Sequence, residues 1–200
     1  MPRWMSVTLF LAPVLHADER TYSVSFDGKH PSTFTVTSKS HADESTEIHS
    51  RFDIGDRTYE STERWQRGRL VRLEGSGAES DRRGSVSLVD GKDGYALKSG
   101  IKEITVRGEV WPTTLWIKPA AEKLMIVDVL TGEVSRGKLD KVGPEQMQID
   151  DKLVRVTKYR LTFGGVSTEL WYDQADRLAR RKWEAKGRSI VVELTGIKAD

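Results

Sequence analysis

The sequence predicts an all-β protein with a single domain, built as a strongly curved antiparallel sheet or a half-open β-barrel. Two observations predict this fold class. Apolar and polar residues alternate with a period of two over most of the chain after residue 20, which is the pattern of strands with one buried face. Turn residues recur about every ten residues between these segments, and that spacing favours a meander of short strands.

The start of the chain predicts a signal peptide over residues 1–17. Arg3 precedes an apolar run that ends near Leu15, and a charged segment follows Ala17. This layout is typical of secretory signals, and the run is shorter than the roughly 20 residues that cross a bilayer. We expect cleavage after Ala17 and a periplasmic protein with no transmembrane segment in the mature chain. An uncleaved N-terminal anchor is the alternative, because Leu15 is larger than the residue usual before a cleavage site.

Composition narrows the classes of function. The chain has no cysteine, which excludes disulfides, thiolate metal sites and a thiol nucleophile. An exported protein without disulfides fits a bacterial periplasm. The 32 Lys and Arg residues are interspersed with 30 Asp and Glu residues, whereas nucleic-acid-binding domains carry a clustered basic excess. Nucleic acid is therefore not a predicted partner.

Alternation indicates the strands of the first half of the chain. Tyr22, Val24 and Phe26 alternate with polar residues before a turn at 27–29, which predicts a first strand with one buried face. Further strands are predicted around residues 33–37, 48–54, 59–65, 70–73, 86–88 and 95–97. A polar stretch rich in Gly and Ser, residues 74–84, predicts a loop.

The middle of the chain has a different character. The stretch GEVWPTTLWIKPAAEKL, residues 108–124, holds two tryptophans and two prolines. Its second half predicts a short helical insertion near residues 112–124, with Pro119 near the start of the helix, where proline is tolerated. Strands resume at 125–129, and LTGE predicts a turn at 130–133. No linker divides residues 18–200, which are predicted to form one domain.

The last third predicts more strands and ends in a three-stranded meander. Short strands are expected around residues 147–149, 154–156 and 161–163, and the meander comprises residues 168–173, 178–185 and 190–194. Within the meander, Leu170 and Tyr172 share one face and Trp171 lies on the other. Arg181 and Trp183 share a face of the next strand. Most of the other cations of this region are predicted to face solvent.

Several motifs resemble one family across most of the chain. They are YSVSFDGK, STERWQRGRLVRLEG, VWPTTLW, DVLTGE, YRLTFGGVSTELWYDQADRLARR and GRSIVVELTG. Together they resemble the DUF6134 family of uncharacterised exported bacterial proteins. The resemblance implies a half-barrel similar to exported lipoprotein carriers, but it implies no catalytic residue, cofactor or ligand.

The sequence offers little catalytic chemistry. His41 and His49 flank the acidic stretch HADESTEIH, but on one strand they would lie about 27 Å apart at about 3.3 Å per residue. A loop could still gather them. No nucleophile elbow or phosphate-binding loop is recognisable. We therefore expect no catalytic, metal or cofactor site, and we expect that the protein is not an enzyme.

The tryptophans suggest a binding site. Indole rings bury a large apolar area, and an inward-facing cation is unfavourable unless it is paired, stacked or near an open mouth. The candidate ligand-lining residues are Trp111, Trp116, Trp171, Arg181 and Trp183. Packing in the core and at sheet edges is the other interpretation of these tryptophans.

Two functions remain open from the sequence. The first is a non-enzymatic binding protein for an apolar or lipid-like molecule in the cell envelope. The second is a structural or protein-interaction module that docks another envelope protein through an edge strand or the basic segment 177–188. The same basic segment could meet anionic lipid head groups.

Overall fold

Fifteen strands form one sheet in the structure, a computed structural model that describes residues 16–54, 57–79 and 82–199. Most of the predicted signal segment, residues 1–15, lies outside the described residues. No α-helix occurs in the described ranges, so none of them holds a helix able to cross a membrane. The all-β prediction is confirmed.

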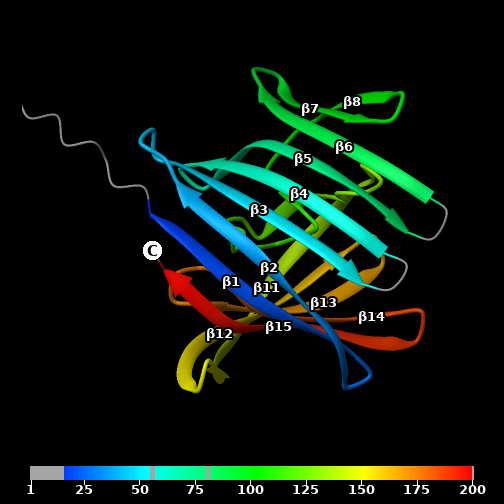
Figure 1. The fold of residues 1–200 in the computed structure, drawn as a ribbon. Helices are drawn as coiled ribbons and strands as arrows, with labels where there is room; N and C mark the ends of the chain where they lie inside the picture. Colours follow the sequence, from blue (N-terminus) through cyan, green and yellow to red (C-terminus); the bar gives the residue numbers. More distant parts are fainter. Residues whose placement is uncertain (1–15, 55–56, 80–81, 200) are drawn as a thin grey trace, which may run out of the picture.

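The sheet begins at β8, descends in order to β1, continues with β15 and descends again to β9. It curls into a nearly closed barrel (Figure 1). The strands are β1 (Ala17–Phe26), β2 (Lys29–Ser40), β3 (Ser45–Ile54), β4 (Arg57–Gln66), β5 (Arg69–Glu79), β6 (Arg82–Gly91), β7 (Gly94–Ser99), β8 (Lys102–Val106), β9 (Val110–Pro112), β10 (Lys123–Val127), β11 (Val134–Ile149), β12 (Lys152–Phe163), β13 (Val166–Asp173), β14 (Leu178–Ala185) and β15 (Arg188–Ala199). Neighbours in the chain pair as antiparallel hairpins from β1 to β8 and from β10 to β15, as the meander prediction requires.

The first and last strands join the two halves of the sheet. β1 pairs antiparallel with β15, and Val24 lies opposite Val192. Tight turns set the register of the hairpins. At the β1–β2 turn, for example, Asp27 and Gly28 have φ of 50° and 80°, as in the hairpin turns whose twist matches that of the strands.

The predicted helix near residues 112–124 is wrong. The chain there forms β9, an irregular stretch and β10, and β9 and β10 pair in parallel. The backbone bonds mainly to other parts of the fold: the Thr113 amide donates to the Val127 carbonyl at 2.9 Å, and the Lys118 amide donates to the Asp176 carbonyl at 3.1 Å. Leu115 has φ of 57°, which a right-handed helix does not allow.

This stretch forms an internal segment, defined here as residues 110–132, that lies inside the barrel (Figure 1). Leu115 is fully buried, and its carbonyl accepts a hydrogen bond from the Tyr172 hydroxyl at 3.0 Å. The Trp116 carbonyl accepts from the Leu178 amide at 3.3 Å. Strands β13 and β14 therefore hold the segment against the concave face of the sheet.

The predicted Gly and Ser loop at 74–84 is also wrong, because β5 and β6 extend through most of it. The turn after β10 packs against this hairpin so closely that side chains do not fit. A Cβ on Gly75 would lie 2.4 Å from the Val129 carbonyl oxygen, and one on Gly84 would lie 2.2 Å from that of Leu130. The glycines thus reflect a close backbone approach within a strand pair.

Candidate binding cavity

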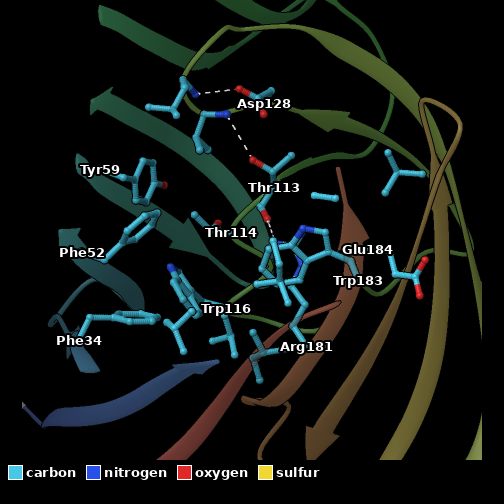
Figure 2. A pocket seen from close by; sticks show the side chains of 18 of the residues that line it. Phe34, Phe52, Tyr59, Thr113, Thr114, Trp116, Asp128, Arg181, Trp183 and Glu184 are labelled. Carbon is cyan, nitrogen blue, oxygen red and sulfur yellow. Dashed lines mark hydrogen bonds between the residues drawn. The ribbon is translucent and has the colours of Figure 1, made fainter. Parts of the chain in front are cut away.

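The internal segment fills only part of the barrel, and a cavity of about 590 Å³ remains beside it. Figure 2 shows aromatic rings on one side of this cavity and Arg181 and Trp183 across from them. The lining residues are Val24, Phe26, Phe34, Phe52, Thr58, Tyr59, Thr113, Thr114, Trp116, Asp128, Val129, Leu130, Phe163, Val166, Leu178, Arg181, Trp183, Glu184, Ala185, Lys186, Ile190 and Val192. Most of these side chains are apolar.

The aromatic wall is contributed by β2, β3, β4 and the internal segment. Phe34 lies 5.7 Å from Phe52 and 5.9 Å from Trp116, and Phe52 lies 4.8 Å from Tyr59, measured between ring centroids. Phe52 and Tyr59 are directly opposite in the β3–β4 pairing, so inward alternation brings them together. Such aromatic pairs add to the stability gained from burial.

Arg181 carries a positive charge into this apolar space. One guanidinium nitrogen, Nη1, donates to the Thr113 carbonyl at 2.5 Å, and the group lies 4.6 Å from the centre of the Trp183 ring. Its Nε atom is buried without a hydrogen-bond partner. Burial disfavours the charged form and lowers the pKa of Arg181 to about 10, so the residue stays protonated at neutral pH.

The nearby carboxylate of Asp128 does not pair with Arg181. Its Oδ1 accepts from the amides of Leu130 and Thr131 at 3.0 and 2.8 Å and from the Thr131 hydroxyl at 3.0 Å. These bonds form the turn that ends the internal segment. Among the residues that the structure describes, no carboxylate forms an ion pair with Arg181.

A second buried charge, Glu63, lies where the internal segment fills the barrel. Both of its carboxyl oxygens are satisfied: Oε1 accepts from the Thr114 hydroxyl, and Oε2 accepts from the Trp65 indole at 2.9 Å. Trp65 also packs against Trp111, with 5.1 Å between ring centroids. Glu63 is fully buried, and this desolvation raises its pKa to about 7.

Three of the five candidate residues, Trp116, Arg181 and Trp183, lie on the cavity wall. Trp111 is buried elsewhere, with its indole donating to the Ile117 carbonyl at 3.2 Å. Trp171 lies on the face of β13 opposite Leu170 and Tyr172, where its indole donates to Glu145 at 2.6 Å. Lys158 stacks on the Trp171 ring at 4.7 Å.

Sequence reasoning missed the aromatic wall and the buried acid. Phe34, Phe52 and Tyr59 carried a usable signal, because each belongs to the apolar parity of a predicted strand. Their convergence depends on the curvature of the sheet, which the pattern does not fix. Glu63 carried the same signal, since it shares the parity of Tyr59 and Trp65 on the predicted strand, but an acid at an inward position was not singled out.

Comparison with known proteins supports the fold and assigns no activity. The family described as "Domain of unknown function (DUF6134)" matches residues 22–195. No curated protein matches the chain significantly. A solved structure is similar, "Crystal Structure of Beta-barrel-like Protein of Domain of Unknown Function DUF1849 from Brucella abortus", with a TM-score of 0.54 and 11% identity over 94% of this chain and 98% of that chain. At that identity the likeness concerns the barrel-like fold alone.

Proposed function

The chain belongs to the DUF6134 family of domains of unknown function, and we propose that it is a non-enzymatic binding protein for an apolar or lipid-like molecule in the cell envelope. The cavity beside the internal segment is the observation that carries this proposal. Its volume of about 590 Å³ falls within the roughly 300–1,000 Å³ typical of small-molecule sites. Its walls are mostly apolar, with a few polar groups, as in such sites.

Several polar groups of the cavity wall are hydrogen-bonded within the protein, and this supports a binding function over catalysis. The Thr113 carbonyl accepts from Arg181, the Thr114 hydroxyl donates to Glu63, and Asp128 forms a turn. These groups hold the internal segment in place. A guest in the cavity would therefore contact mainly the rings of Phe34, Phe52 and Trp116.

Titration with the uncharged fluorescent probe N-phenyl-1-naphthylamine tests the binding function. We expect saturable binding, with at least about tenfold weaker affinity in Phe52→Ser, because an apolar contact is replaced by a hydroxyl. Leu153→Ser is the matched control, since Leu153 is 70% exposed. Absence of binding to the wild-type protein, with no lipid found by native mass spectrometry after purification from periplasm, would contradict the proposal.

The envelope location is part of the same proposal and rests on the signal pattern of residues 1–17. Fractionation of cells that produce the full chain tests it. We expect the protein in the periplasmic fraction, shortened at the N-terminus. Recovery of the uncut chain in the cytoplasm would overturn this part of the proposal.

A second candidate function, docking of another envelope protein, draws on the exposed strand β8 at one end of the sheet order. Ile104 on β8 is 50% exposed, and Ile101 just before it is fully exposed. Edge strands can pair with other chains. This candidate predicts co-purification of a partner that is lost when Ile104 is replaced by lysine.

A further inference from the structure

We propose that the molecule bound in the cavity is a single-chain amphiphile with an anionic head group, and that the head group pairs with Arg181. This inference rests on the proposed binding function and adds the chemical class of the ligand. It depends on the charge of one side chain, on the volume of the cavity and on the distribution of apolar rings around it.

The charge of Arg181 is incompletely compensated by the protein. The guanidinium has five N–H donors, but the described residues give it one hydrogen bond, to a neutral carbonyl, and one aromatic face. Its Nε donor is buried and unpaired. Arg181 as a whole is half-buried, and a partly desolvated charge without an anionic partner is costly. A carboxylate, sulfate or phosphate is the group that a guanidinium binds best.

The acidic residues near the cavity do not take this role. Asp128 uses one carboxylate oxygen for three hydrogen bonds within its own turn. Glu184 lies on an exposed position of β14, and Figure 2 shows its carboxylate pointing away from Arg181. Asp128 acts on Arg181 as a nearby negative charge, but neither acid forms an ion pair with it that a ligand anion would have to displace.

The size of the cavity indicates one chain instead of two. At roughly 30 Å³ per heavy atom, which is the volume of a water molecule in the liquid, 590 Å³ holds about 20 atoms. A fatty acid or alkyl sulfate has that size, whereas a phospholipid with two chains is more than twice as large. The rings of Phe34, Phe52 and Trp116 offer the apolar surface for its chain.

The unpaired donor of a second residue supports an acceptor-rich head group. Trp116 lines the cavity, and its indole Nε1 is buried without a hydrogen-bond partner. The cavity wall thus offers a charged donor, Arg181, and a neutral donor, Trp116, each with an unpaired N–H.

Calorimetric titration with four probes of equal chain length tests the head-group preference. The probes are dodecanoate, dodecyl sulfate, 1-dodecanol and dodecyltrimethylammonium, each below its micelle concentration. We expect both anions to bind at least about tenfold more tightly than the alcohol, as one charge-assisted hydrogen bond provides. The cationic probe should bind most weakly. The two anions together separate a general anion site from one that is specific for carboxylates.

Two neighbouring arginines give a matched pair of variants. Arg181→Met should abolish the preference for dodecanoate over dodecanol. Arg180→Met should retain it, because Arg180 lies on the other face of β14 and pairs with Glu193. Arg181→Lys, which keeps the charge, should retain part of the preference and serves where the methionine variant does not fold.

The outcomes separate this inference from the binding function. Equal affinity for dodecanoate and dodecanol would overturn the role of Arg181 and leave apolar binding intact. Binding of none of the four probes, together with none of the uncharged naphthylamine, would overturn both. Tightest binding of the cationic probe would also overturn the inference, because it would place the ligand charge away from Arg181.

Discussion

The barrel interior has a filled half, occupied by the internal segment next to Glu63, and a hollow half, the cavity beside Arg181, and the two treat a charged side chain in opposite ways. In the filled half, Glu63 has both oxygens bonded by Thr114 and Trp65. In the hollow half, Arg181 has one neutral carbonyl partner and an unpaired Nε. A buried charge that is fully hydrogen-bonded specifies structure, whereas one left short of partners is a candidate for ligand binding.

The size of the inward side chains explains where the internal segment lies. Gly75 and Gly84 leave room for the backbone of the segment to touch β5 and β6, and Gly77 leaves room for the side chain of Leu130. On β2, β3 and β4 the inward positions hold Phe34, Phe52 and Tyr59 instead. These three rings face the cavity, and the segment meets this wall through the side chain of Trp116, whose ring lies 5.9 Å from that of Phe34.

The largest expected effect separates a tryptophan of the filled half from one of the hollow half. Trp111→Ala should lower the free energy of unfolding by about 3–5 kcal/mol, because it removes a fully buried ring and leaves a void. Trp183→Ala should lower it by about 1 kcal/mol or less, because that ring is only half-buried beside the cavity. Urea unfolding followed by circular dichroism measures both values.

Equal losses in the two variants would contradict the comparison. They would mean that Trp183 is as tightly packed as Trp111, and that the hollow half is a core like the filled half. Trp183→Phe, which keeps an aromatic ring at this position, is the control that separates loss of the ring from other effects of the alanine substitution.

The second prediction concerns pH and the filled half. The pKa of Glu63 is about 7 in the folded protein against an ordinary value of 4.5. The folded state therefore binds the proton more tightly, and this stabilisation is fully present below about pH 4.5 and is lost as the pH rises through 7. Between pH 5 and pH 8 the free energy of unfolding should fall by about 2–3 kcal/mol from this group.

Glu63→Gln should remove that fall. A glutamine keeps both contacts, since its carbonyl can accept from Trp65 and its amide can donate to the Thr114 hydroxyl. Denaturant unfolding at four pH values compares the variant with the wild type, and Glu60→Gln, at an exposed site, is the control. A wild-type protein whose stability rises from pH 5 to pH 8 relative to Glu63→Gln would show that the carboxylate is ionised in the fold.

Local patterns were enough to predict the strands, and long-range contacts were needed for the rest. The two-residue alternation located the hairpins, and the C-terminal meander of β13, β14 and β15 has the predicted order. The same alternation placed Arg181 and Trp183 on one face, as the structure does. Pairing of β1 with β15 is not encoded locally, because it joins strands about 170 residues apart.

The internal segment shows why prediction failed in the middle of the chain. Its prolines and threonines give no clear period, and residues 113–118 bond to β10 and to the turn after β13 without forming a helix. The glycines at 75, 77 and 84 have the composition of a loop, yet they lie on strands that another backbone touches. Both errors involve contacts between segments more than 40 residues apart, such as Lys118 with Asp176 and Gly84 with Leu130.

The smallest expected change in the free energy of unfolding is that of Arg181→Met, and its sign distinguishes a binding residue from a structural one. Removal of a half-buried charge that lacks an ion pair relieves a desolvation cost, so Arg181→Met should leave the free energy of unfolding unchanged or raise it by about 1 kcal/mol. Binding residues often carry such a cost. Arg180→Met, which breaks the pair with Glu193 on the other face, should lower stability slightly by comparison. A loss of 2 kcal/mol or more in Arg181→Met, measured by urea unfolding, would show instead that its bond to Thr113 anchors the internal segment and that both buried charges serve structure.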